Sequence, residues 1–509
     1  MSRSSDRGVG KSARVTAINA LGQLASFSLF AVIAFLYGAT EITDAFFLAL
    51  AVPALIIGPV VNSIHSVAVP MITASRIRTP EEAPRLAGAA LGWLSVLGVV
   101  ATLLLVVLAP FVVELLGLPL ALRTSVVRQT WILAPLVALQ VVSGILHAIL
   151  NADGSFERPA LAFAARHASV LVALLSLRPL LGELAIAVAF VLGAFVQFIL
   201  LAAQLRGASF RVRPSLAVDA SLRQSIAQAT PLVGSSVVLQ GGSFALRAFA
   251  SGLAPGSVTM IDYASRIAGA VVELVGSGVL VVSMVNWSEL VARNETARVR
   301  EAVRRLVGLS VIVLVPIAVL FGALSPDVVA ITLGRGQMSQ QSLALTAAVL
   351  AFYSLTIPVE IVGRLYLRLF LAWHETRALA AVALARLGTL VVVAFALRGA
   401  FGVRGLAAAE LASLVAYVAV LGALAGRHLC AGAGVPWPLV GRATLGGALM
   451  WGVAVLVRAQ VSTLPALLAA GLSAGVALIA YGGLAALTGD AAPLIARFRL
   501  GTVPPAERP

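Results

Sequence analysis

Charged side chains and cysteine are both scarce in this sequence. Only 11% of its 509 residues are Asp, Glu, Lys or Arg, whereas soluble domains carry roughly 25%, so a soluble globular protein is excluded. The single cysteine, Cys430, excludes an intrachain disulfide and a cysteine-based metal cluster. The five histidines are scattered without metal-ligand spacing. The sequence therefore predicts neither a metal site nor a cofactor.

Motifs for catalysis are missing as well. The sequence contains no P-loop, no G-x-S-x-G and no H-E-x-x-H, and no polar loop holds an acidic pair of the glycosyltransferase kind. We therefore predict that the chain is not an enzyme and does not hydrolyse ATP. If it transports a molecule, the energy must come from a Na⁺ or H⁺ gradient, the membrane potential or later consumption of the cargo.

Long apolar runs dominate what is present. The chain is 60% hydrophobic, with a mean hydropathy of +1.02, and a membrane-spanning helix needs about 20 mostly apolar residues. The pattern predicts an all-α integral membrane protein with about 14 transmembrane helices. The expected spans are 14–37, 44–73, 86–116, 127–150, 159–180, 184–205, 224–252, 257–288, 301–324, 340–370, 377–397, 404–426, 438–457 and 464–487.

The basic residues are distributed unevenly between alternate loops. With the N-terminus inside, the cytoplasmic segments hold 23 of the 36 Lys and Arg residues. This asymmetry follows the positive-inside rule and places both termini in the cytoplasm. We interpret the net charge of +15 as a means of orienting the chain in the membrane and of attracting anionic lipid. We predict no nucleic-acid partner.

A weak internal repeat indicates duplicated helix bundles. Three pairs of landmarks are 218 or 219 residues apart: Asp44 with Asp262, Gly144 with Gly363, and Arg158 with Arg377. We predict two six-helix lobes related by a pseudo-twofold axis along the membrane normal, followed by an extra helix pair. The expected segments are a basic N-terminal arm at 1–13, the N-lobe at 14–222, the C-lobe at 223–427, the helix pair at 428–490 and a cytoplasmic tail at 491–509.

Polar or charged side chains recur at helical spacing within three of the predicted spans, where each charge costs at least about 2.5 kcal/mol near the bilayer centre. Further single charges are Arg386, Glu410 and Arg166, the last beside His167. The three stripes are Gln240, Ser243 and Arg247; Asp262, Arg266 and Glu273; and Glu360, Arg364 and Arg368.

Two interpretations of these stripes stay open. The pairs Asp262 with Arg266 and Glu360 with Arg364 could neutralise each other on a helix surface, and Arg247 could extend to the interface. Alternatively, the guanidinium groups line a cavity and bind phosphate, while the acids bind a coupling cation or hold the arginines. The predicted cavity residues are Arg266, Arg247, Arg364, Arg368, Asp44, Asp262 and Glu273, and the ion-coupling candidates are Glu360, Glu410 and Asp262.

Four segments resemble a known family. They are 43–50 with Pro53 and Val69-Pro70, 256–267, 333–336 with 345–358, and 374–377. Together they resemble the MurJ-type lipid II flippases of the multidrug/oligosaccharidyl-lipid/polysaccharide exporter superfamily, and the likeness covers most of the first 12 spans.

The resemblance implies a bundle of 14 helices in the bacterial cytoplasmic membrane. Such a bundle moves an undecaprenyl-pyrophosphate-linked sugar to the outer leaflet by alternating access. In that family a cationic cavity receives the head group, and a groove beside the last two helices, here 428–490, holds the lipid tail. Arg266 matches a family cavity arginine, and Asp44 matches the aspartate that opens the second helix.

The sequence departs from the family where arginines are expected in the first two helices. Those positions hold Gln23, Leu29, Ile57 and Gly58. The leading hypothesis is a flippase for a polyprenyl-(pyro)phosphate-linked saccharide. The alternatives are a cation-coupled multidrug or small-molecule exporter and a non-transporting scaffold for envelope assembly. The expected partners are a lipid-linked glycan, membrane lipid and envelope-synthesis proteins, with the chain itself a monomer.

Overall fold

The computed structural model describes residues 2–218, 220–293, 295–373, 375–429, 437–461 and 463–487. Cys430 and the predicted tail at 491–509 lie outside these ranges. Every regular element within them is helical. The elements are α1 (Ser2–Tyr37), α2 (Glu41–Arg78), α3 (Ala83–Leu115), α4 (Leu120–Leu133), α5 (Pro135–Ala152), α6 (Glu157–Leu181), η1 (Gly182–Leu184), α7 (Ala185–Leu205), α8 (Ala220–Ser251), α9 (Ser257–Ala292), α10 (Thr296–Ala323), α11 (Ser325–Leu333), α12 (Gln340–Ala372), α13 (Thr376–His428), α14 (Trp437–Gln460) and α15 (Ala466–Leu487).

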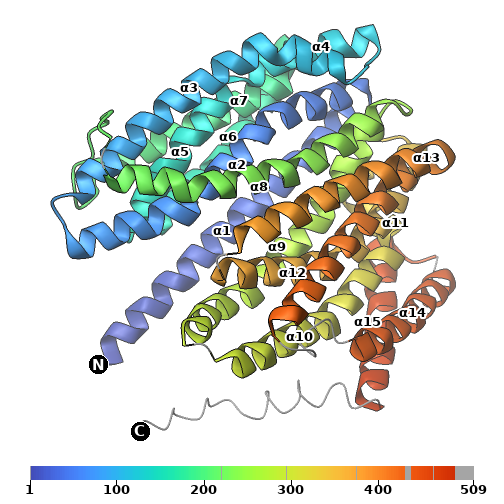
Figure 1. Ribbon diagram of the computed structural model, residues 1–509. Coiled ribbons are helices and arrows are strands. Elements are labelled where there is room, and N and C mark those ends of the chain that lie inside the picture. Colours follow the sequence, from blue (N-terminus) through green and yellow to red (C-terminus); the bar gives the residue numbers. More distant parts are fainter. Residues whose placement is uncertain are drawn as a thin grey trace. The chain divides into compact units, whose positions relative to one another are not determined.

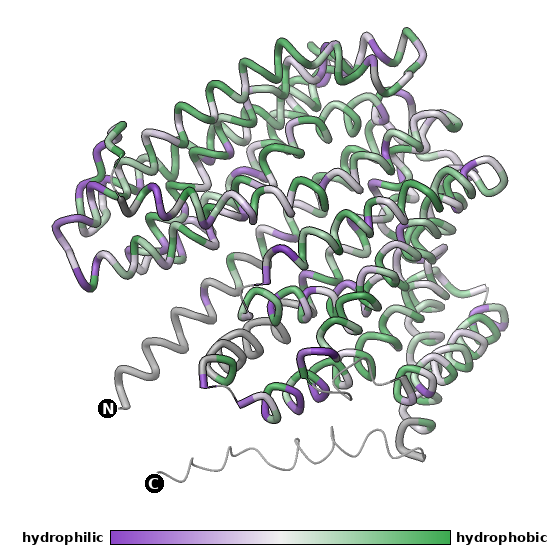
Figure 2. The backbone as a smooth tube through the Cα atoms, in the orientation of Figure 1, coloured by the Kyte–Doolittle hydropathy of each residue, from purple (hydrophilic) through white to green (hydrophobic). Residues whose placement is uncertain are grey.

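The all-helical prediction is confirmed for the described residues. A helix satisfies its own backbone hydrogen bonds, which lipid cannot do, so long apolar runs in a bilayer become helices. Eleven helical stretches are long and apolar enough to cross a membrane, and hydrophobic residues follow most helices along their length (Figure 2). The stretches Glu157–Leu205 and Arg377–His428 contain 49 and 52 residues, about twice the length that one crossing requires.

The chain forms two compact units. Unit 1 contains residues 1–266, 335–342 and 376–409, and unit 2 contains 267–334, 343–375 and 410–509. The predicted lobes at 14–222 and 223–427 were defined by repeat symmetry rather than by compactness. Their boundaries therefore stay a prediction.

In unit 1, α2 is the central helix and packs against α4, α5 and α8 (Figure 1). The helix α1 lies on α6, α6 lies on α7, and α3 lies on α5. The core between them is apolar, with Ile145 and Ile149 of α5 fully buried. On the outside of α3, side chains such as Leu103 and Phe111 are exposed, as expected for a surface that faces lipid.

In unit 2, α10 packs against α14, and α14 packs against α15. Met450 and Ala454 of α14 are fully buried in the contact between these helices. An ion pair joins α14 to α11, because the Nε and Nη2 atoms of Arg458 each donate to one carboxylate oxygen of Asp327 at 2.8 Å. This bidentate pair fixes the direction in which α14 ends.

Proline has different effects in two predicted spans. The helix α2 is one element of 38 residues that continues through Pro53 and Pro59. The span at 127–150 is instead divided into α4 and α5, with Pro135 as the first residue of α5. Proline fits the first helical turn, where its missing N–H costs nothing, and packed neighbours allow a helix in a membrane to tolerate it elsewhere.

Candidate functional site

The start of α2 is held by a local capping arrangement. The Thr40 N–H donates to the Thr43 hydroxyl at 2.9 Å, and the reciprocal contact completes a capping box. Asp44 follows in the first turn of α2 and is 4% exposed. The cap fixes where α2 begins and so fixes where this buried carboxylate points.

Asp44 binds the start of a second helix, α9. Its carboxylate accepts hydrogen bonds from the Gly256 N–H at 2.7 Å, the Thr259 N–H at 2.8 Å and the Thr259 hydroxyl at 2.6 Å. The first N–H groups of a helix have no partner within the helix, and they attract negative charge. Asp44 therefore joins α2 to α9, and these bonds occupy both of its oxygens.

Gly256 makes this close approach sterically feasible. Its φ of +87° lies in the left-handed region, and a Cβ at this position would lie 2.5 Å from the Ala39 carbonyl oxygen. Any larger residue would meet both a backbone penalty and a clash. The glycine therefore permits the α8–α9 turn to pack against the α1–α2 turn.

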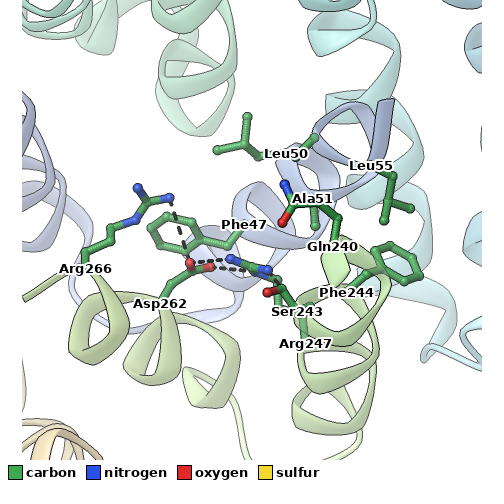
Figure 3. Close-up of a pocket in the computed structure, with 11 residues that line it drawn as sticks. Phe47, Leu50, Ala51, Leu55, Gln240, Ser243, Phe244, Arg247, Asp262 and Arg266 are labelled. Atoms are coloured by element: carbon green, nitrogen blue, oxygen red, sulfur yellow. Dashed lines mark hydrogen bonds and ion pairs between the residues drawn. The ribbon is translucent and has the colours of Figure 1, made fainter. Parts of the chain in front are cut away.

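The charged residues Arg247, Asp262 and Arg266 come together in unit 1 (Figure 3). Arg247 of α8 binds Asp262 of α9 bidentately, with Nε to Oδ2 at 3.0 Å and Nη2 to Oδ1 at 2.8 Å. Arg266 lies one turn further along α9, with its Nη2 3.8 Å from the same Oδ1. Two guanidinium groups share one carboxylate, so the cluster carries a net positive charge.

Aromatic rings of α1 and α2 hold the Arg266 side chain. Its guanidinium carbon lies 3.6 Å from the centre of the Phe30 ring and 5.6 Å from the Phe47 ring. Such cation–π contacts are stronger for a desolvated cation. The buried Nε of Arg266 has no hydrogen-bond partner among the described residues. The arginine is thus positioned by the rings and keeps a hydrogen-bond donor unused.

These charges border a cavity of about 140 Å³. Gln240 and Ser243 of α8 line it together with Arg247, Asp262 and Arg266, and apolar residues of α2 form the opposite wall (Figure 3). The polar stripe expected at 224–252 therefore meets Asp262 and Arg266 of the stripe expected at 257–288, whereas Glu273 of that second stripe does not line the cavity. The structure does not bring Asp44 to its wall, because its oxygens bind α9.

Unit 2 contains a second charged group, centred on Arg364 of α12. Its Nη1 lies 2.8 Å from Glu273 of α9, and its Nη2 lies 2.8 Å from Glu360, one turn earlier on α12. Arg368 lies one further turn along, and Glu410 belongs to α13. Glu360 pairs with Arg364 along the same helix, as the first interpretation expects, while Glu273 binds Arg364 across helices. Two carboxylates around one guanidinium give this group a net negative charge.

Sequence reasoning did not include Phe30, Phe47 or Thr259 among the site residues. A phenylalanine in an apolar run resembles ordinary core, and only the spacing to a charged residue on another helix distinguishes it. Thr259 acts through its position in the first turn of α9. That position could be inferred only after the helix start was known.

Comparison with known proteins gives one matching family model and several solved structures with a similar fold. The model described as lipid II flippase MurJ matches residues 33–470. A solved structure described as lipid II flippase MurJ in an inward closed conformation has a TM-score of 0.75 and 18% identity, covering 95% of this chain and 99% of that one.

Two further solved structures share the fold at lower similarity. An inward-facing multidrug resistance MATE family transporter of the MOP superfamily has a TM-score of 0.67 and 14% identity, with 81% of this chain and 94% of that chain covered. A MOP superfamily transporter from Pyrococcus furiosus has a TM-score of 0.62 and 14% identity, with coverages of 82% and 95%. A search of curated protein sequences gives no match. Because the family model spans most of the sequence and the fold agrees with it, this chain belongs to the MurJ lipid II flippase family.

Proposed function

We propose that the protein is a flippase that moves a polyprenyl-(pyro)phosphate-linked saccharide across the bacterial cytoplasmic membrane by alternating access. The cluster of Arg247, Asp262 and Arg266 carries this proposal. It places two guanidinium groups at a cavity within a membrane bundle, and guanidinium binds phosphate oxygens bidentately. Membership of a flippase family supports the same conclusion.

The size of the cavity is consistent with binding only part of the cargo. Pockets that enclose a drug-sized ligand measure roughly 300–1,000 Å³, whereas this one measures about 140 Å³. It would hold a phosphate group and exclude a whole lipid-linked saccharide. We therefore assign the phosphate to unit 1, and we propose that the predicted groove beside α14 and α15 receives the polyprenyl chain.

A count of 14 crossings is part of the proposal. The stretches Glu157–Leu205 and Arg377–His428 each contain a glycine with positive φ, Gly182 at +55° and Gly402 at +54°. Two crossings in each stretch, together with α9, would raise the eleven candidates to 14. Both termini would then be cytoplasmic, and the predicted lobes would each contain six crossings.

The test is complementation of a bacterial strain in which the resident lipid II flippase can be depleted. We expect the wild-type gene to restore growth and Arg266→Ala to fail, because truncation removes a phosphate-binding cation worth about tenfold or more in affinity. Arg158→Ala is the matched control, since Arg158 of α6 is exposed and donates to the Gly207 carbonyl. Immunoblots of membrane fractions establish equal expression.

The two negative outcomes separate the alternatives. Growth with Arg266→Ala equal to the wild type would eliminate this arginine as the binding cation. Failure of the wild-type protein, present in the membrane, would eliminate lipid II as cargo. It would favour a cation-coupled exporter, which the MATE-like fold and the carboxylates Glu273 and Glu360 support. Coupling to Na⁺, H⁺ or the membrane potential stays a proposal in either case.

A further inference from the structure

Arg166 of α6 is a membrane-embedded cation of unit 1 that has no acidic partner among the residues that the structure describes. Its Nη1 donates to the Gln140 Oε1 of α5 at 3.0 Å, and the Gln140 amide donates to the Gln197 Oε1 of α7 at 3.2 Å. In the part of the chain that the structure describes, no carboxylate lies within ion-pair distance of Arg166. The residue therefore keeps a positive charge that the described residues do not neutralise.

Arg166 points into the helix bundle rather than toward lipid. Leu161, Val172 and Leu175 mark the outer face of α6, with exposed fractions of 52%, 64% and 52%. At 100° per residue, Arg166 lies on the opposite side of the helix from this face. The residue is only partly exposed, and the hydrogen bond to Gln140 uses one of its five N–H donors.

A purely structural role does not explain the charge. The Gln140–Gln197 hydrogen bond already links α5 to α7 with neutral groups, and side-chain amides serve well as contacts between membrane helices. An arginine adds a charge that costs at least about 2.5 kcal/mol near the bilayer centre. A neutral side chain would avoid that cost. The cation is therefore expected to have an anionic partner, and the described protein does not supply one.

The surroundings of Arg166 connect it with the cluster around Arg266. His167 lies next to it on α6, donates from Nδ1 to the Phe163 carbonyl at 3.0 Å, and is close enough to interact electrostatically with both arginines. The helices α1 and α2 carry no Arg or Lys between residues 15 and 75. Within the first six predicted spans, Arg166 is thus the cation placed furthest from the loops.

We propose that Arg166, together with the side-chain amides of Gln140 and Gln197, forms an oxyanion-binding site for a phosphate of the polyprenyl-linked cargo. The guanidinium group supplies a fork of N–H donors, and each amide can reorient to donate to a phosphate oxygen. The proposal rests on the proposed function, because the phosphate is that of the transported molecule. It assigns a cargo-binding role to α5, α6 and α7, whereas α1 and α2 carry no Arg or Lys between residues 15 and 75.

The experiment measures binding of undecaprenyl phosphate to the full-length protein in nanodiscs of phosphatidylcholine. Arg166→Gln should weaken binding at least tenfold because it removes the charge, and Arg166→Lys should weaken it less because the charge remains without the fork. Arg158→Gln, an exposed arginine of the same helix, should bind as the wild type does. Size-exclusion chromatography checks that each variant is folded. If Arg166→Gln does not fold, the comparison of Arg166→Lys with the wild type is the test.

Each contrary result has a distinct meaning. If Arg266→Ala abolishes binding while both Arg166 variants bind like the wild type, Arg166 is structural and this inference fails, although the proposed function stands. If wild-type protein does not bind undecaprenyl phosphate at all, the proposed function fails. A parallel titration with phosphatidylglycerol identifies the source of the oxyanion: equal or tighter binding that depends on Arg166 would overturn the cargo assignment in favour of a lipid head group.

Discussion

Asp44 and Asp262 occupy equivalent places in the repeat predicted from the sequence but have different partners. Asp44 accepts hydrogen bonds from neutral groups at the start of α9, whereas Asp262 binds two arginines. The sequence could predict that both carboxylates are embedded and that Asp262 lies beside Arg266. It could not predict the bond to Arg247, because that contact depends on how α8 turns into α9. Local spacing therefore predicts which charged residues are embedded, whereas tertiary packing determines their partners.

The contact between Asp44 and α9 should contribute measurably to stability. Asp44→Asn removes the charge and turns one acceptor into a donor that faces N–H groups, which should cost about 2 kcal/mol. Thr259→Val removes only the 2.6 Å hydroxyl bond and should cost about 1 kcal/mol. In thermal unfolding of the purified proteins, the wild type should have the highest melting temperature, Thr259→Val an intermediate one and Asp44→Asn the lowest. Equal values for Asp44→Asn and the wild type would mean that the carboxylate does not join the two helices.

Among the elements, the apolar runs predicted helices well and predicted their connections poorly. The segment 206–218 between α7 and α8 reads as a polar break, yet it packs closely on unit 1. The Ser215 N–H donates to the Gly88 carbonyl of α3 at 3.0 Å, and Arg76 of α2 contacts Ser209 at 3.1 Å and Asp153 at 3.3 Å. Such contacts leave no periodic pattern in the sequence, so hydropathy could not reveal them.

Gly92 of α3 should be required for docking of this segment. A Cβ at Gly92 would collide with the Ser215 carbonyl oxygen, which is backbone and cannot swing aside. Gly92→Ala should therefore displace residues 206–218 and speed trypsin cleavage after Arg206 and Arg211 several-fold. Gly399→Ala is the control, because nothing lies within 4 Å of that position. Identical cleavage rates for both variants would contradict close packing of this segment against α3.

At the scale of the whole molecule, contacts within unit 1 agree with the sidedness predicted from charge. The ends of α2 and α5 and the segment 206–218, all predicted to be cytoplasmic, contact one another through Arg76, Asp153 and Ser209. The turns at Gly38, Gly256 and Gly336, all predicted to be external, also meet, with Gly38 against Gln337 and Gly256 against Ala39. Helix order and the distribution of basic residues could predict this pairing. The repeat symmetry and the exact count of crossings cannot be read from these contacts.

The orientation itself can be tested with single cysteines. Replacing Cys430 by serine leaves a chain without cysteine, into which Arg206→Cys or Arg335→Cys is introduced; both positions are exposed. Because the basic residues place 206–218 inside, a membrane-impermeant maleimide should label position 335 in intact cells and position 206 only in inverted membrane vesicles. The reverse pattern would invert the assigned topology and place the Arg76–Asp153 contact outside. Labelling of both positions from one side would mean that an even number of crossings, rather than the predicted three, separates residues 206 and 335, and the count of 14 would have to be revised.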